Sequence, residues 1–402
     1  MSNITGNVST RGFVGFVVFI AVLGAFSSLV NDMYLPTMPA MMREFHTSTS
    51  MTQLGLTFAM IGMGIGSVVL GSLSDRYGRK PVLFASMILF VAATAASLFS
   101  RSITYFIICR LFQGLGAGGP MVLSTSIPAD DYQGRQLAKV MAVVGAINGI
   151  APATGPLLGG FMADSVGWRG IFVLLLAIGV IVTLFVAKMK ESLPASRRAP
   201  AQGLGAYWTR YRVLLKNGRF MLYVFIKSIG IALLYAYISS APFIIQDHYG
   251  FTSLQFGLIF GGNALAIAVG STLAMKFKVM KQGMIVGCIG IFALAVAEAW
   301  IMYHADHFLY YELAAIPMLL FSGMIFSSSN TLAMEVGRAE AGTASAILSI
   351  VKYVLAALVA PLVGLGNLMH STAWVYVACA LVALLLAIPA MRRGPLPAMG
   401  KK

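Results

Sequence analysis

Long apolar segments recur along the whole 402-residue chain and constrain its fold more than any other feature. An α-helix needs about 20 mostly apolar residues to cross the hydrocarbon core of a bilayer. Segments of this kind occupy residues 13–38, 51–73, 81–100, 103–127, 138–163, 169–190, 219–244, 253–276, 283–303, 308–333, 342–368 and 372–391. The sequence therefore predicts an all-α membrane protein with twelve transmembrane helices.

Composition supports a bilayer as the solvent. Hydrophobic residues make up 58% of the chain and charged residues only 10%, whereas soluble domains carry about 25% charged residues. The cysteines Cys109, Cys288 and Cys379 each lie in an apolar run without metal-ligand spacing. We expect them to be small core residues, and we expect no metal and no cofactor. No small-residue cleavage site follows the first span, so we expect this span to be retained.

The net charge of +15 at first suggests nucleic acid, but the basic residues are not gathered on one element. They form short clusters between the apolar segments, as the positive-inside rule predicts. If the N-terminus is cytoplasmic, 22 of the 28 Lys and Arg residues fall on the cytoplasmic side and three in outer loops. The other three lie inside spans. This bias predicts a multi-pass inner-membrane protein with both termini in the cytoplasm, and no nucleic-acid partner.

The longest polar stretch divides the chain into two halves. Residues 191–218 contain Pro, Gly and several basic residues, and they follow the sixth span. We expect residues 1–190 and 219–402 to form two pseudo-symmetric six-helix bundles joined by a cytoplasmic linker, the repeat architecture of secondary transporters. Within the linker, residues 206–215 are expected to form an amphipathic helix on the membrane surface.

The stretch GSLSDRYGRKPVL, residues 71–83, lies between the second and third spans. It resembles the G-x-L-x-D-R-x-G-R-K signature of the major facilitator superfamily. Gly71 is expected to let two helices approach closely, because small residues allow such contact. Gly78 is expected to form a tight turn, which glycine permits. Asp75 is expected near helix starts, where a carboxylate is favoured. The basic residues expected to hold the loop on the cytoplasmic side are Arg76, Arg79 and Lys80.

Two further motifs narrow the resemblance. RLFQGLGAG, from Arg110, resembles the fourth-helix pattern R-x-x-Q-G-x-G, and GIAPATGPLLGG, residues 149–160, resembles a fifth-helix antiporter pattern. Together they are similar to the twelve-span drug:proton antiporters, and within these to the bicyclomycin and chloramphenicol resistance (Bcr/CflA) subfamily. The resemblance implies a monomeric carrier that exchanges a small molecule for protons. The chain departs from the subfamily pattern at Ala129, where relatives often have arginine, and at Lys352, where relatives usually have a neutral residue.

Asp32 is the first charged residue of its span, and a charge inside a bilayer is rarely left facing lipid. Helical spacing places Ala21, Ala25, Ser28 and Asp32 on one small, polar stripe, which we expect to line a water-filled cavity. Burial favours a neutral carboxyl group and a nearby cation favours a charged one. A carboxylate that alternates between these settings can take up and release a proton. An ordinary hydrogen-bonded carboxylate at the outer interface is the alternative.

Arg110 is the expected partner of Asp32, because arginine keeps its charge under ordinary conditions. Arg110 and Gln113 share one face of the fourth helix and are expected to reach the cavity and the substrate. A structural role for Arg110, bonding to backbone carbonyls, is the alternative.

The second half contributes Lys227, Tyr235 and Lys352 as expected substrate contacts. Lys352 lies mid-span, whereas Lys227 is close enough to the cytoplasmic end to extend to the interface. Together with Arg110, Lys352 would make the cavity positive, which favours a neutral or anionic substrate. Glu298, near the outer end of the ninth span, is interpreted as mainly structural.

Residues at the cytoplasmic gate are expected to form charge networks. Asp130 and Glu335 occupy equivalent positions on the fourth and tenth helices, and we expect them to pair with Arg79 and Arg338 or their neighbours. Stripes of small residues on the second, fifth and eighth helices are expected to be sliding surfaces between the halves. On the fifth helix this stripe consists of Gly145, Gly149, Pro152, Gly155 and Gly159, and Pro156 belongs to the antiporter motif of the same helix. Tight packing within each half is the alternative for these stripes.

Other classes of protein remain to be weighed. A proton-coupled uptake carrier would share the fold. A membrane-embedded enzyme would need a nucleophile–base pair, a metal cluster or a nucleotide loop, and the sequence contains no G-x-x-x-x-G-K-[ST], H-E-x-x-H or G-x-S-x-G. The sequence HADH at 304–307 is a weak metal motif, better interpreted as a solvated loop. A channel or receptor is weaker still, and no nucleotide domain supports ATP-driven transport.

Overall fold

The computed structural model describes residues 10–198, 211–305 and 307–392, and within these residues the regular structure is entirely helical. The first part contains α1 (Thr10–Asp32), α2 (Met38–Glu44), α3 (Thr49–Tyr77), α4 (Arg79–Leu98), α5 (Ile103–Asp131) and α6 (Gly134–Lys188). The second contains α8 (Gly218–Pro242), α9 (Ser253–Ala274), α10 (Met280–His304), α11 (Phe308–Val336), α12 (Ala341–Val359) and α13 (Leu368–Arg392). Short helical turns are η1 (Leu35–Thr37), η2 (Ala195–Arg197), η3 (Phe243–His248), η4 (Arg338–Glu340) and η5 (Ala360–Gly364).

Helix α6 accounts for two of the expected spans. In the described residues, eleven helices are long and apolar enough to cross a membrane, and α6 is 55 residues long. A straight helix of that length would extend about 80 Å, far more than one bilayer crossing. The chain breaks at Gly167, whose φ of 63° lies in the left-handed region that favours glycine. With α6 divided there, the twelve expected crossings are present.

The first span is shorter than the sequence pattern predicts. We expected a helix to residue 38, but α1 ends at Asp32, and η1 and α2 follow as separate pieces. Pro36 and Pro39 each stand at the start of one of these pieces, where proline is tolerated. The break leaves Asp32 at a helix end.

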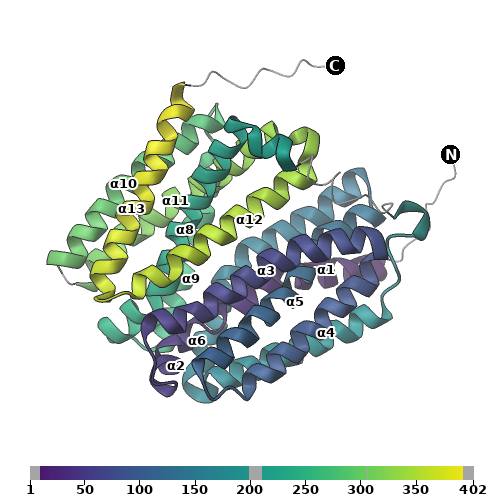
Figure 1. The fold of residues 1–402 in the computed structure, drawn as a ribbon, viewed down its shortest axis with the longest axis horizontal. Helices are drawn as coiled ribbons and strands as arrows, with labels where there is room; N and C mark the ends of the chain where they lie inside the picture. The colour runs from purple at the N-terminus through teal and green to yellow at the C-terminus, as the bar shows by residue number, and fades with distance from the viewer. Residues whose placement is uncertain (1–9, 199–210, 306, 393–402) are drawn as a thin grey trace.

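The helices form two bundles, α1–α6 and α8–α13, which meet mainly through α6 against α9 and α3 against α12. Figure 1 shows that the bundles converge at the end that carries α2 and separate towards the opposite end. We call these the closed end and the open end. The chain direction places residues 34–53, 239–253 and 360–366 at the closed end, and both described chain termini at the open end.

A small set of polar contacts joins the bundles at the closed end. Each links a residue of the first bundle to one of the second. The hydrogen bonds are Gln53 Nε2 to the Ser239 carbonyl (3.0 Å), Ser50 Oγ to the Pro361 carbonyl (3.1 Å), and Gln246 Nε2 to the Pro36 carbonyl (3.0 Å). The ion pair is Arg43 with Asp247 (2.7 Å). Since exposed ion pairs and single hydrogen bonds each contribute only about 1 kcal/mol, this closure is one that can be reversed.

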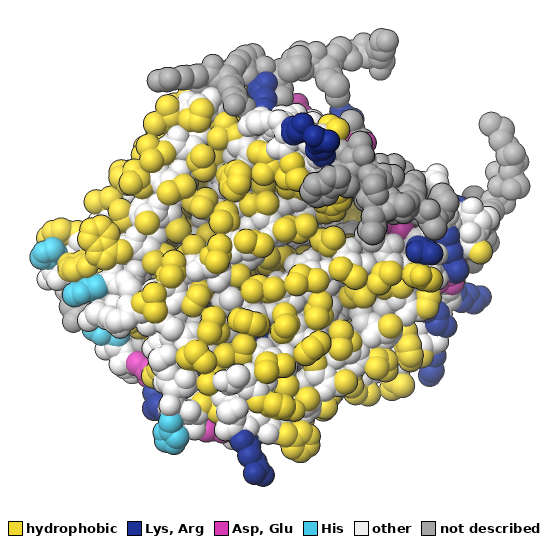
Figure 2. Space-filling view, viewed as in Figure 1, with side chains coloured by type: hydrophobic (Ala, Val, Ile, Leu, Met, Phe, Trp, Pro, Cys, Tyr) yellow, Lys and Arg dark blue, Asp and Glu magenta, His cyan; other side chains and the backbone are white. Residues whose placement is uncertain are grey.

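The outer surface suits a bilayer. Large apolar side chains are exposed on it, among them Phe161 at 74% and Trp374 at 67%. Figure 2 shows hydrophobic side chains across the middle of the visible face, with Lys and Arg gathered towards its two ends. A soluble protein rarely exposes so continuous an apolar patch.

The glycine stripe of α6 packs mainly inside the first bundle. A Cβ added to Gly155 would lie 3.1 Å from the Asp32 Cβ, and one added to Gly159 would strike the Met33 carbonyl oxygen. The expectation that Gly155 and Gly159 form a sliding surface between the halves is therefore wrong in this conformation. Small residues bring α6 onto α1, and this contact sets the position of Asp32.

The residues of α6 that contact the second bundle follow Gly155 and Gly159 by one position. Pro156 is one of them, since a Cβ on Gly257 of α9 would lie 2.6 Å from the Pro156 carbonyl oxygen. A Cβ on Gly160 would strike the Ser253 carbonyl oxygen.

The linker begins as part of the first bundle. The Glu191 carboxylate accepts hydrogen bonds from the backbone amides of Arg79 (2.8 Å) and Lys80 (3.3 Å), at the start of α4. A carboxylate at this position satisfies free helix amides and the positive end of the helix dipole. Residues 206–210, half of the expected surface helix at 206–215, lie outside the described residues, and residues 211–216 are helical.

Candidate functional site

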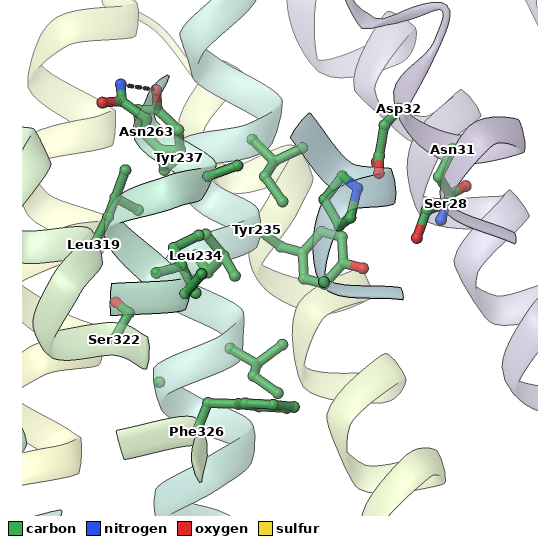
Figure 3. Close-up of a pocket in the computed structure, with 18 of the residues that line it drawn as sticks. Ser28, Asn31, Asp32, Leu234, Tyr235, Tyr237, Asn263, Leu319, Ser322 and Phe326 are labelled. Carbon is green, nitrogen blue, oxygen red and sulfur yellow. Dashed lines mark hydrogen bonds between the residues drawn. The ribbon is translucent and has the colours of Figure 1, made fainter. Parts of the chain in front are cut away.

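A cavity of about 460 Å³ lies between the two bundles. Its size falls in the range of roughly 300–1,000 Å³ that is typical of small-molecule sites. The first bundle contributes side chains from α1, α3 and α6, and the second from α8, α9, α11 and α12. Figure 3 shows Ser28, Asn31 and Asp32 on one side of it, Tyr237, Asn263, Leu319 and Ser322 on the other, and Tyr235 between them.

Asp32 is the acidic group of the first wall. It is 8% exposed and lines the cavity together with Ser27, Ser28 and Asn31. Its carboxylate has no hydrogen bond and no ion pair with any described residue. A buried carboxylate without a partner is costly to keep charged.

Arg110 is placed differently from our expectation. It is completely buried and does not line the cavity. Its guanidinium group donates to the carbonyls of Val30 (3.2 Å) and Gly55 (3.3 Å) and to the side-chain oxygens of Gln113 (2.5 Å) and Asn31 (3.4 Å).

Aromatic rings complete the Arg110 site. The guanidinium carbon lies 4.4 Å from the centre of the Tyr34 ring, a cation–π distance. Gln113 is also completely buried, and its amide donates to Thr94 Oγ1 at 2.8 Å. The prediction that Arg110 and Gln113 contact the substrate is therefore not met in this conformation. The structural alternative fits, because Arg110 ties α1, α3 and α5 together behind the cavity wall.

The second wall carries the cation. Lys352 lines the cavity, and its Nζ lies 3.9 Å from the centre of the Tyr353 ring. It makes no hydrogen bond or ion pair with a described residue. Tyr235 also lines the cavity, as expected. Lys227 does not line it, and its ammonium group instead donates to Asn330 Oδ1 at 2.7 Å.

The deepest part of the second wall is aromatic and amide-bearing. Tyr237 and Phe260 stack with their ring centres 5.7 Å apart, and Asn263 Nδ2 donates to the Tyr237 hydroxyl at 2.7 Å. Sequence reasoning missed Asn31, Asn263 and Tyr353 as lining residues. An asparagine within an otherwise apolar span was the available signal, because a buried amide needs partners.

The signature loop forms a charge network at the open end. Arg79 Nε bonds to Asp130 Oδ2 at 2.8 Å, and its Nη1 bonds to Ser74 Oγ at 2.7 Å and to Asp75. Gly78 has a φ of 106°, which only glycine adopts readily, and a Cβ there would strike Glu191. Gly71 packs on Val122 of α5 with 3.3 Å available to a Cβ. The exposed Arg76 lies over the Tyr77 ring, and Lys80 is held at its backbone amide.

The second bundle lacks a described counterpart of this network. Glu335 and Arg338 are both exposed, and neither makes an ion pair with a residue that the structure describes. The expectation that they pair at the gate is wrong for this conformation. The loop between α9 and α10 contains no aspartate at the position equivalent to Asp75. The second bundle therefore lacks the acid that pairs with Arg79 in the first.

Comparison with known proteins agrees with the fold and the signature. The sequence model of the Major Facilitator Superfamily matches residues 20–361. The chain is 32% identical to the uncharacterized MFS-type transporter YdgK of Bacillus subtilis, over 90% of this chain and 91% of that one. It is 30% identical to a chloramphenicol resistance protein of Pseudomonas aeruginosa, over 71% of this chain and 68% of that one.

A solved structure shows the same fold. It is a bacterial homolog of the human lysosomal transporter Spinster in an inward-facing, occupied conformation, with a TM-score of 0.74 and 15% identity over 96% of this chain and 98% of that one. The chain belongs to the Major Facilitator Superfamily. It is a membrane transporter and not an enzyme.

Proposed function

We propose that this protein exports small drug-like compounds in exchange for protons, by alternating access of the central cavity to the two sides of the membrane. The unpartnered Asp32 carboxylate on the cavity wall is the observation that carries the proposal. The chloramphenicol resistance relative supports drug export as the direction of transport.

The orientation follows from charge. Most Lys and Arg residues flank the spans at the open end, whereas Arg43, Arg101 and Arg169 are at the closed end. By the positive-inside rule the open end faces the cytoplasm. The structure then corresponds to an inward-open state, in which a compound from the cytoplasm can enter the cavity. The rocking units are residues 1–190 and 219–402, joined by the linker 191–218.

Exchange requires that proton and substrate compete. In the inward-open state Asp32 can lose its proton to the cytoplasm when a compound binds beside Asp32 and Tyr235. A proton taken up from the outside would then reset the carboxyl group to its neutral form. Arg110 is a fixed cation behind Asn31, and it lowers the free-energy cost of the charged state of Asp32 without touching the substrate.

Proton release tests the role of Asp32. Purified wild type in weak buffer should release protons when chloramphenicol is added, whereas Asp32→Asn should bind the drug and release markedly fewer protons. Asp164→Asn, which changes an exposed carboxylate, is the matched control. Equal release from Asp32→Asn and wild type would contradict the assignment. A strain lacking the transporter that starves for one nutrient, with unchanged drug sensitivity, would favour uptake instead.

Lys352 sets the charge of the substrate. Its unpaired ammonium group in the cavity favours neutral or anionic compounds over cations. Lys352→Gln should lower the affinity for anionic compounds by roughly 10- to 100-fold, since a charge-assisted hydrogen bond contributes about 1.5–3 kcal/mol. Binding measured with paired neutral and anionic compounds checks this. An unchanged ratio between the two would show that Lys352 does not select substrate.

A further inference from the structure

Glu298 of α10 is a second buried acid. It is completely buried, and neither of its carboxyl oxygens has a hydrogen-bond partner. Placing an ionised carboxylate in such a site costs several kcal/mol unless a cation or donors compensate. We therefore expect Glu298 to carry a proton in this conformation.

The groups that face Glu298 come from three neighbouring helices. They are Glu312 and Tyr311 on α11, Tyr237 on α8 and Tyr376 on α13, and all are close enough to interact electrostatically with it. No Lys or Arg is among these described neighbours. Glu312 Oε2 and the Tyr311 hydroxyl are likewise without partners. The cluster contains acids and hydroxyl groups but no cation, so it can be neutral only by holding protons.

The cluster adjoins the transport cavity. Tyr237 and Asn263 line the cavity, and the Asn263 side chain also lies next to the Glu312 carboxyl group. Figure 3 shows the hydrogen bond from Asn263 to the Tyr237 hydroxyl at one edge of the cavity. Glu312 is half-buried in the second turn of α11, which begins at the closed end. The cluster thus lies between the cavity and the closed end.

We propose that Glu298 and Glu312 form a second proton-binding site, distinct from Asp32, and that Asn263 and Tyr237 connect this site to the cavity. This inference rests on the proposed exchange of protons for substrate. In the transfer step, the O–H bond of one carboxylic acid breaks and the proton moves through the Tyr237 hydroxyl, or an adjacent water, to the cavity. The carboxylate that remains is then stabilised only by water, which enters from the side of the membrane to which the site is open. Each bundle would in this way contribute one acid to the coupling.

Infrared difference spectroscopy tests the site without requiring transport. The carbonyl stretch of a protonated carboxylic acid, recorded on purified protein in lipid discs, should lose one band in Glu298→Gln. The same band should persist in Asp32→Asn and in the control Asp164→Asn. A spectrum of Glu298→Gln that is identical to wild type would overturn the proposal, because Glu298 would then not hold a proton.

Proton counting separates this site from Asp32. With chloramphenicol as the ligand, Glu298→Gln and Asp32→Asn should each release about half as many protons as wild type, since the count equals the change in bound protons. If Asp32→Asn abolishes release and Glu298→Gln leaves it unchanged, the second site fails and the proposed function stands. If wild type releases none while the infrared band is present, the proposed function fails and the buried acid remains.

Tyr237→Phe keeps both carboxyl groups, so it tests the proposal even if the Glu298→Gln variant does not fold. It removes one hydroxyl between the cluster and the cavity, so we expect at least tenfold slower proton release with an unchanged final count. Release at the wild-type rate would exclude Tyr237 as the connection.

Discussion

The two bundles treat their buried charges in opposite ways. In the first bundle, Arg110 is surrounded by acceptors, Arg79 pairs with Asp75 and Asp130, and Glu191 holds the start of α4. In the second bundle, Glu298 has no partner and Lys352 makes no ion pair within the described residues. The charges of the first bundle are mostly paired, whereas the second bundle pairs Lys227 with Asn330 but leaves Glu298 and Lys352 without a hydrogen-bond or ion-pair partner among the described residues.

The contrast separates structural from functional polar groups. A buried charge with all its partners in place stabilises one arrangement and is expensive to disturb. A buried acid without partners lowers stability and is retained where a protonation change is useful. Asp32 is the exception in the first bundle, and it lies on the cavity wall where the two bundles meet.

Removal of Arg110 should have the largest effect on stability. Arg110→Met leaves two backbone carbonyls, Asn31 and Gln113 without their donor, and we expect a loss of about 3–5 kcal/mol in the free energy of unfolding, since each buried acceptor left unsatisfied costs about 1–3 kcal/mol. Denaturant unfolding of protein in mixed micelles measures this. A loss below 1 kcal/mol would mean that Arg110 is not the fixed centre of the first bundle.

Arg79 and Arg338 form a matched pair across the two bundles. Arg79→Gln breaks charge-assisted hydrogen bonds to Asp75 and Asp130, with an expected cost of about 1.5–3 kcal/mol. Arg338→Gln should change stability by less than about 0.5 kcal/mol, because the exposed side chain has no described ion-pair partner. Equal losses of stability from the two substitutions would contradict the difference between the charge networks of the two bundles.

Glu298→Met should have an effect of opposite sign. It replaces two unpartnered oxygens by an apolar side chain of similar length, so we expect a gain of about 1–2 kcal/mol in stability. The same variant should release about half as many protons as wild type, as expected where function is maintained at the expense of stability. A marked loss of stability would show that Glu298 makes hydrogen bonds, through water for example, and belongs with the structural charges.

Much of the fold follows from local pattern. The apolar runs located the spans to within a few residues except at the ends of the first and eleventh, and the polar stripe of α1 placed Asp32 on the cavity. The charge network expected at the cytoplasmic gate placed Arg79 beside Asp130. These features depend on helix periodicity and on the solvent, both of which act along the chain.

The errors arose where the direction of a side chain decides its role. Helical spacing put Arg110 and Gln113 on one face, but that face packs on α1 and α3 and not on the cavity. Gly155 and Gly159 form a real stripe, yet they contact α1 and leave the bundle interface to Pro156 and Gly160. Periodicity identifies which residues share a face, and it does not identify the neighbouring helix.

The sequence by itself determined that this chain crosses a bilayer twelve times, that its basic loops lie on one side, and that an acid sits at the end of the first span. Those outcomes follow from the transfer of side chains between water and lipid, which each segment undergoes largely on its own. Only the tertiary structure decided that Arg110 is enclosed, that Lys352 stays unpaired, and that Glu298 and Glu312 come together. Such pairings depend on contacts between helices distant in sequence, and in lipid these contacts are selected by close packing and by hydrogen bonding rather than by hydrophobicity.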